Sequence, residues 1–242
     1  MGYRKPLVFE IYGEFFFSEE ISDQLQFEIA AKFLEEEKTI ETTPVLNQGK
    51  ESVGGRTRYR IWSSDKRQLV QVFPNRVTYN YLPFATREGE YSGWDYYLSD
   101  LISVWEKVCS GKKEMELQKV SLCYIDKIDE IDDDDFVFGK YFNCSGKVFP
   151  AMLKETKKST DIIIGNGAIS EEDNQQIKAK LVRQDGKYYF QLDTLLHRYV
   201  TEENKHKDGI RSVFNDMHDN CNIIFEDIIT DFMRETIMGG RV

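Results

Sequence analysis

The sequence lacks the cysteine spacings that are typical of metal sites and redox pairs. Its four cysteines, Cys109, Cys123, Cys144 and Cys221, are never two or four residues apart. Zinc-binding and dithiol motifs place cysteines at those short separations. We therefore expect reduced, mostly buried thiols and no metal or cofactor that depends on them.

Proline and glycine are also sparse, with 5 and 16 residues among 242. Hydrophobic residues make up 40% of the chain and aromatic residues 13%, which is typical of a folded protein and excludes a low-complexity or disordered one. A chain of this length buries roughly 70–75% of the surface that it exposes when unfolded. We predict one α+β domain over residues 1–242.

No apolar run approaches the roughly 20 residues of a membrane-spanning helix. Charged side chains, among them Arg4, Lys5, Glu10 and Glu14, interrupt the first twenty residues and exclude the apolar centre of a signal peptide. We expect a cytoplasmic protein that does not bind a membrane.

An excess of positive charge is missing as well, since the net charge is −10. Proteins that bind nucleic acids present a basic surface that releases counterions from the phosphate backbone. The composition therefore disfavours nonspecific nucleic-acid binding.

Familiar catalytic motifs are absent. The sequence contains neither GxSxG nor HExxH, and the segment 162–173, IIIGNGAISEED, lacks the GK[ST] of a phosphate-binding loop and the third glycine of a dinucleotide fingerprint. A turn or an irregular hairpin explains that segment better. We expect no catalytic residues and favour a protein that is not an enzyme.

An acidic run follows an alternating apolar stretch in residues 119–136, KVSLCYIDKIDEIDDDDF. A calcium-binding loop needs spaced oxygen ligands, a glycine at its sharp turn and a distal glutamate, and IDEIDDDDFVFG lacks that order. Like charges in sequence repel one another and stay solvated. We predict a connecting loop and no metal site here.

The first half of the chain alternates strand and helix patterns. Residues 7–17 predict a strand, and 21–38 an amphipathic helix capped by Ser22 or Ser18. Three runs, TRYRIW, QLVQVF and RVTYNYL, predict an antiparallel meander. Apolar residues at three- and four-residue intervals over 91–109 predict a well-buried helix, which Gly111 ends.

The second half repeats this order. It predicts a strand at 116–128, a short helix near 134–143 and a strand pair around 149–154 and 160–164. Asp185-Gly186 predicts a two-residue hairpin turn. A continuous apolar helix face predicts a closing helix from Lys207 to Ile237, followed by Gly239 and Gly240.

These elements predict an α+β fold with a curved antiparallel sheet and two long helices. The halves 1–112 and 113–242 read as a pseudo-duplication, in a helix-grip or saddle-like architecture. A helix face and a sheet face each need a partner to be buried, so we expect the two halves to share one sheet.

Four segments together resemble a sporadically distributed bacterial family of unknown function. They are KPLVFEIYGEF, LVQVFPNRVTYNYLPF with WDYYLSDLISVWEKV, VSLCYIDKI, and MHDNCNIIFEDIITDFMRETIMG. The third is similar to the family's leucine-arginine-tyrosine-isoleucine-asparagine-arginine-isoleucine strand, but has Cys123, Asp126 and Lys127 where the family has arginine, asparagine and arginine. The fourth resembles a closing helix with a histidine followed by an acidic residue. The resemblance implies the fold, no reaction, and an accessory role in a phage-defence or toxin-type system.

Candidate binding residues come from the aromatic set and from two isolated polar residues. Tyrosine and tryptophan on the strands and the middle helix predict mostly core, with a ligand cavity or a partner surface as the alternative. His218 is expected to form a hydrogen bond in the interior or to a partner. The ligand- or partner-binding candidates are Tyr79, Tyr81, Trp94, Tyr97, Arg183 and His218.

Three functions remain open. The first is a non-enzymatic adaptor that binds a protein from its own operon in a bacterial complex, with a homo-oligomer also compatible. The second is a sensor of a small nucleotide-like or apolar ligand, held between sheet and helices. The third is a hydrolase whose site is assembled from scattered carboxylates, His218 and Arg183.

Overall fold

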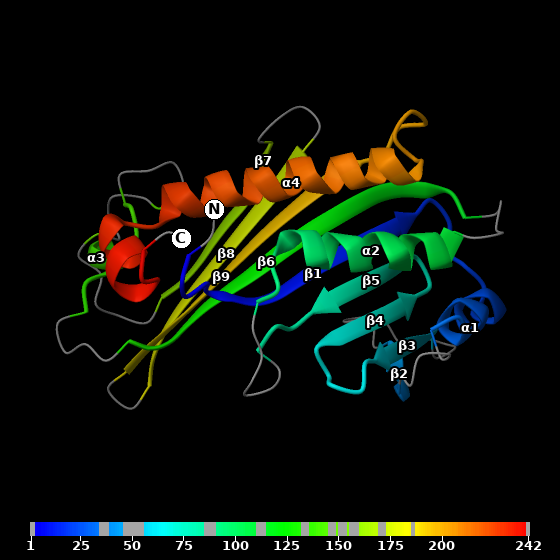
Figure 1. Cartoon of the computed structure of the whole chain (residues 1–242), viewed down its shortest axis with the longest axis horizontal. Coiled ribbons are helices and arrows are strands. Elements are labelled where there is room, and N and C mark those ends of the chain that lie inside the picture. Colours follow the sequence, from blue (N-terminus) through cyan, green and yellow to red (C-terminus); the bar gives the residue numbers. More distant parts are fainter. Residues whose placement is uncertain are drawn as a thin grey trace. The chain divides into compact units, whose positions relative to one another are not determined.

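The computed structural model describes residues 3–33, 39–45, 56–84, 91–109, 115–131, 136–144, 149, 154, 160–168, 173–184 and 187–240. It is a mixed α+β structure with one nine-stranded sheet. The strands are β1 (Val8–Phe17), β2 (Thr39–Val45), β3 (Arg56–Trp62), β4 (Gln68–Phe73), β5 (Arg76–Tyr81), β6 (Leu117–Ile131), β7 (Thr160–Ala168), β8 (Asp173–Gln184) and β9 (Lys187–Tyr199). The helices are α1 (Asp23–Ala31), α2 (Trp94–Cys109), α3 (Phe138–Tyr141) and α4 (Lys207–Ile228), followed by a π-helical segment at Met233–Ile237 (Figure 1).

The strands are hydrogen-bonded in the order β2-β3-β4-β5-β1-β6-β9-β8-β7. The pairs β2–β3, β3–β4, β4–β5, β1–β5 and β7–β8 are antiparallel. The predicted α+β class and the antiparallel meander are therefore confirmed. No helix among the described residues is long and apolar enough to cross a lipid bilayer.

The chain divides into two compact units. Unit 1 comprises residues 1–9, 123–196 and 215–242, and unit 2 comprises residues 10–122 and 197–214. Four elements, β1, β6, β9 and α4, contribute residues to both units. The division thus groups residues that are distant in sequence.

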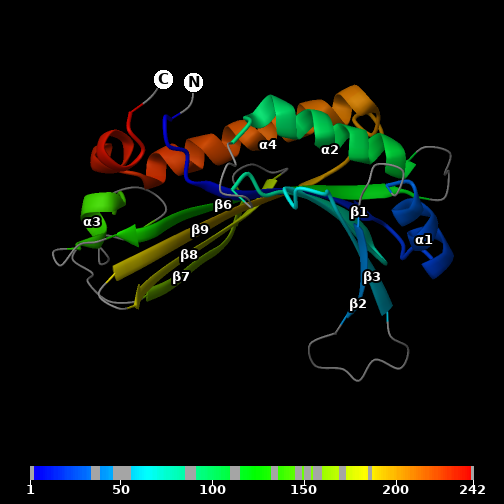
Figure 2. The ribbon, with the colours of Figure 1, turned by 60° about the horizontal axis from the view of Figure 1, so that its bottom comes forward.

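In unit 2, α1 begins where the sequence predicts and ends earlier. The Ser22 side chain accepts a hydrogen bond from the Leu25 backbone N–H at 3.2 Å, as expected for an N-cap. The helix ends at Ala31, so the predicted helix 21–38 is wrong at Lys32 and Phe33, and residues 34–38 lie outside the described part of the chain. The predicted apolar face is buried and packs beside β3 and β4 (Figure 2); its members are Ile21, Leu25, Ile29 and Phe33.

Helix α2 packs on β5 and β1 because Gly13 leaves room for it. A Cβ atom at Gly13 would lie 2.8 and 2.9 Å from the two δ-carbons of Leu101 and 2.9 Å from the hydroxyl of Tyr97. Such distances are far inside van der Waals contact. The absent side chain therefore determines how closely α2 approaches the sheet.

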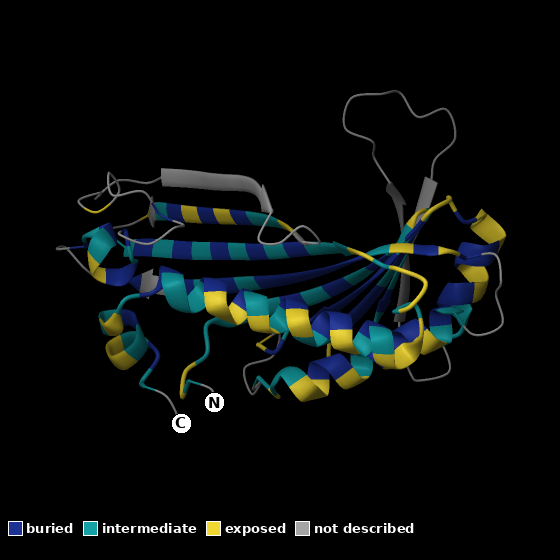
Figure 3. Cartoon of the chain, turned by 90° about the horizontal axis from the view of Figure 1, so that it is seen from above, coloured by how far each residue is buried: buried dark blue, intermediate teal, exposed yellow. Residues whose placement is uncertain are grey.

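In unit 1, the strands alternate between buried and accessible residues. In β9 every even-numbered residue from Tyr188 to Leu196 is buried, and in β8 Lys178 and Lys180 are exposed between buried neighbours (Figure 3). This period of two is typical of strands with one covered face. The predicted turn at Asp185-Gly186 lies outside the described residues, as do most of the predicted strand around 149–154 and the stop at Gly111.

An aromatic cluster fixes α3 against β9. Phe136 stacks on Tyr188 with ring centroids 4.1 Å apart, and Phe142 lies 3.9 Å from Phe190. The ring of Phe138 meets that of Phe149 edge-on at 5.2 Å. Offset and edge-to-face pairs of this kind add to the burial of the rings themselves.

The closing helix is shorter than predicted, because the chain after Ile228 pairs with the α3 segment. The side-chain amide of Asn143 donates to the Asp227 carbonyl at 3.1 Å, and its backbone N–H donates to the Ile228 carbonyl at 2.7 Å. Ile229 then forms an antiparallel bridge with Phe142. The predicted continuous helix 207–237 is therefore wrong: α4 ends at Ile228.

The predicted acidic loop is also corrected. Strand β6 continues to Ile131, so Asp126, Asp129 and Glu130 belong to the strand and not to a connecting loop. Residues 132–135 lie outside the described part of the chain.

We expect Gly13→Ala to lower the free energy of unfolding by about 1–3 kcal/mol, because an added methyl group overpacks this contact. Denaturant unfolding measures the loss. In the double variant Gly13→Ala/Leu101→Ala, the loss in free energy of unfolding should be well below the sum of the losses in the two single variants, because the clashing δ-carbons are gone. If the two losses simply add, Leu101 is not the side chain that excludes a Cβ atom at Gly13.

Candidate functional site

Four of the predicted binding residues gather in unit 2. Tyr79 and Tyr81 lie on β5, and Trp94 and Tyr97 lie on α2. The Tyr97 ring is the common neighbour, with centroids 5.5 Å from Tyr79, 6.4 Å from Tyr81 and 5.5 Å from Trp94. Because the three tyrosines are at most 2% exposed, they belong to the core, as the sequence predicted for most of the aromatic set.

A row of residues in register across four strands forms the base of this site. Gly13 of β1 is paired with Tyr79 of β5, Tyr79 with Val70 of β4, and Val70 with Ile61 of β3. Side chains paired in register across neighbouring strands lie on the same face of a sheet. This row therefore lies on the face that α2 covers.

A pocket of about 180 Å³ lies between this row and α2. Its walls contain both apolar and polar side chains. They are formed by Phe33, Ile61, Ser63, Gln68, Val70, Tyr79, Asp100, Ser103, Val104 and Lys107. The lining thus comes from α2, from β3, β4 and β5, and from the residues that follow α1 and β3, all in unit 2.

The carboxylate of Asp100 is the centre of the polar wall. Its Oδ2 accepts hydrogen bonds from the side-chain amide of Gln68 at 2.9 Å and from the hydroxyl of Tyr79 at 3.1 Å. The Gln68 amide also donates to the hydroxyl of Tyr96 at 3.2 Å. Charge-assisted bonds of this kind hold a carboxylate in one orientation.

Two tyrosine hydroxyls take part in this hydrogen-bond network: that of Tyr79 donates to Asp100, and that of Tyr96 accepts from Gln68. Burial raises the pKa of Tyr79 far above its usual value, and the negative charge of Asp100 raises it further. The pKa of Tyr96 is raised for the same two reasons, with burial the larger. Both shifts favour the protonated, neutral hydroxyl.

The pocket carries charges of both signs. Asp100 and Lys107 lie seven residues apart on α2, which is about 10.5 Å along the helix axis. The ammonium of Lys107 lies 5.4 Å from the centre of the Phe33 ring. A ligand held here meets a carboxylate at one end and a cation at the other.

A second set of hydrogen bonds fixes Tyr81, at the edge of the aromatic group. Its hydroxyl accepts from the guanidinium of Arg67 at 2.7 Å and lies 3.0 Å from the Ser92 hydroxyl. The guanidinium carbon of Arg67 also lies 5.5 Å from the centre of the Tyr81 ring. Tyr81 therefore supports the site without lining the pocket.

The other two predicted residues, His218 and Arg183, belong to unit 1. The Nδ1 atom of His218 lies 2.6 Å from the hydroxyl of Tyr124, and its Nε2 lies 2.9 Å from the amide of Asn222. The expected hydrogen-bonding role of His218 is thus observed. Arg183 lies on β8, and its side chain is outside the description.

A polar network on β1, β4 and β5 was not predicted. The Asn80 amide donates to Glu10 at 2.6 Å and itself accepts from Gln71 at 2.9 Å. Burial raises the pKa of Glu14, and Arg76, 3.0 Å away, opposes that rise. The signal in the sequence is the alternation of polar residues at Glu10 and Glu14 with apolar ones along a single strand.

Asp126 was missed because it resembled a part of the acidic run. It is 6% exposed, and burial raises its pKa to about 7, with a smaller contribution from the charge of Asp193. Among the described residues, no group of three or more histidines, cysteines and carboxylates is placed to hold a metal ion.

No protein-family model matches this chain, and no curated protein matches it at a significant level. The functional argument for this chain therefore depends on the geometry of its own residues.

The stability of the protein should fall with pH because of Asp126. The native carboxyl holds its proton up to about pH 7, whereas the unfolded one releases it near 3.8, so the free energy of unfolding decreases as pH rises between these values. Asp126→Asn removes the ionisable group, and with it the cost of burying a charged carboxylate at high pH. We expect the variant to be more stable than the wild type by about 1–4 kcal/mol at pH 8, and almost equally stable at pH 4.

Urea unfolding at both pH values measures this difference. Asp219→Asn is the control, because Asp219 lies on the exposed side of α4, and its effect should be small at either pH. A stability difference for Asp126→Asn that is the same at pH 4 and pH 8 would contradict the assignment.

Proposed function

We propose that this protein is a non-enzymatic binding protein and that the pocket at Asp100 holds a small polar ligand. The observation that supports this most is the convergence of Gln68 and Tyr79 on one oxygen of Asp100 inside a pocket of about 180 Å³. Ligand sites typically combine apolar walls with a few polar groups that fix orientation. This pocket has both features.

The chemistry of the pocket limits the class of ligand. The half-buried carboxylate of Asp100 repels phosphate, so a nucleotide is disfavoured here, and the hydroxyl, amide and carboxylate groups disfavour a purely apolar molecule. The volume is below that of a drug-sized site. An amine or a polyol, with a donor group directed at Asp100, fits best.

The adaptor role is a second proposal, compatible with the first. The acidic composition, with a net charge of −10, and the absence of catalytic motifs support a protein that acts through contacts with a partner in a bacterial complex. A sensor needs such a partner to pass on the presence of its ligand. The resemblance to the bacterial family of unknown function supports an accessory role in a phage-defence or toxin-type system.

The finer architecture is likewise our proposal. Halves 1–112 and 113–242 each contain strands followed by a long helix, 16 residues in α2 and 22 in α4. This repetition supports a pseudo-duplicated, helix-grip or saddle-like fold.

Native mass spectrometry of protein purified under mild conditions, followed by a thermal-shift screen of small amines and polyols, tests the ligand. Asp100→Asn keeps the volume of the side chain but removes its charge. Because a hydrogen bond to a charged group contributes about 1.5–3 kcal/mol, we expect affinity to fall about 10- to 100-fold.

Glu106→Gln is the matched control. It removes one negative charge from the same helix, but Glu106 is half exposed and pairs with Lys207 at 2.8 Å, outside the pocket. Its affinity should equal that of the wild type. If Asp100→Asn binds the ligand as tightly as Glu106→Gln does, the ligand does not lie at Asp100 and the proposal fails.

A further inference from the structure

A second concave site lies in unit 1, on the face of the sheet formed by β6, β9 and β8. It is a groove of about 280 Å³. Lys127 comes from β6, Tyr189 and Gln191 from β9, and Lys180, Val182 and Gln184 from β8. The buried Phe190 of β9 also lines the groove. The other lining residues alternate with the buried residues of their strands, so the groove opens on the accessible side of the sheet.

The groove is cationic although the protein is acidic. Within the described part of the chain, neither Lys127 nor Lys180 has a carboxylate within ion-pairing distance. Asp193 of β9 accepts a hydrogen bond from the Gln191 amide at 2.8 Å, and it is not among the residues that line the groove. The lining therefore contains two ammonium groups and no carboxylate.

One of these cations is held in place. The ammonium of Lys127 lies 3.4 Å from the centre of the Phe9 ring, which is a close cation–π contact. Lys180, by contrast, is exposed and free to follow a ligand. A fixed charge and a mobile charge together suit an anionic group that enters from solvent.

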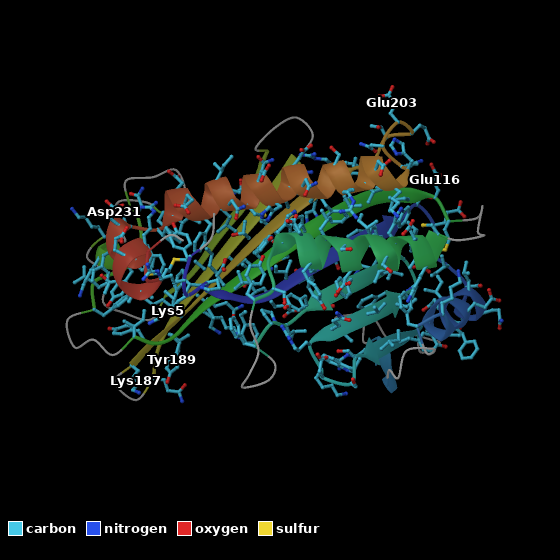
Figure 4. All side chains as sticks on the ribbon, in the orientation of Figure 1. Lys5, Glu116, Lys187, Tyr189, Glu203 and Asp231 are labelled. Carbon is cyan, nitrogen blue, oxygen red and sulfur yellow. The ribbon has the colours of Figure 1, made fainter. Side chains whose placement is uncertain are left out.

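The remaining polar and aromatic groups suit a planar ring. Tyr189 is half-buried and lies beside Lys187 at the hairpin end of β9 (Figure 4). A tyrosine ring on the surface of a sheet stacks on nucleobases. The side-chain amides of Gln184 and Gln191 both donate and accept hydrogen bonds, as the edge of a base requires.

We propose that this groove binds a mononucleotide, with its phosphate at Lys127 and Lys180 and its base on Tyr189. The net charge of −10 opposes a long polyanion, which favours a single nucleotide over a polymer. The site is distinct in chemistry from the pocket at Asp100, whose carboxylate disfavours phosphate. It does not depend on the function proposed for that pocket.

Isothermal titration calorimetry of the full chain with AMP, adenosine and inorganic phosphate tests the proposal. AMP should bind more tightly than either fragment. Lys180→Gln should weaken AMP binding about tenfold, because it removes one charge-assisted contact to phosphate. Tyr189→Leu should weaken it about 5- to 100-fold through the loss of stacking.

Lys178→Gln is the matched control. Lys178 lies two residues before Lys180 on the same face of β8 and is equally exposed, but it does not line the groove. AMP affinity should be unchanged in this variant. Circular dichroism confirms that each variant is folded.

Three results would overturn the proposal. The first is an absence of AMP binding to the folded wild type. The second is equal weakening by Lys178→Gln and Lys180→Gln, which indicates diffuse surface charge. The third is tighter binding of a single-stranded oligonucleotide than of AMP, which indicates a nucleic-acid surface.

Discussion

The close approach of α2 to β1 at Gly13 is the constraint on which the rest of unit 2 depends. Leu101 and Tyr97 occupy the space that a side chain at Gly13 would need. Tyr97 then stacks on Tyr79, and Tyr79 reaches Asp100. The depth at which the helix lies on the sheet therefore determines the position of the carboxylate in the pocket.

Local patterns predicted the elements well where the contacts that decide them are local. The period of four in Ile21, Leu25, Ile29 and Phe33 identified the buried face of α1, and Ser22 its cap. The end of α4 was not predictable in this way. It depends on Asn143, which is some 84 residues from its carbonyl partner Asp227, and no helical period contains that information.

The candidate site was predictable only in its apolar half. Tyrosines on a strand and on a helix stripe indicated where a sheet and a helix meet, and Tyr79, Tyr81, Trp94 and Tyr97 do meet. The sequence did not identify Asp100 and Gln68 as site residues, because a polar residue on an amphipathic helix or a strand normally faces solvent. The burial of Asp126 was not predicted for a related reason, since its acidic neighbours suggested a solvated loop.

The two concave sites differ in a way that composition cannot show. The net charge of −10 is a sum over the whole chain and does not show that a carboxylate lies in the pocket of one unit and two lysines in the groove of the other. It predicts only that polyanions are repelled. At short range the local charge decides: the carboxylate of Asp100, held by two donors, suits the proposed ligand that donates hydrogen bonds, and the ammonium of Lys127, held over Phe9, suits the proposed ligand that accepts them. An acidic protein can therefore bind a single anionic ligand while it excludes a chain of them, because one phosphate responds to the two nearest ammonium groups and a polymer responds to the whole surface.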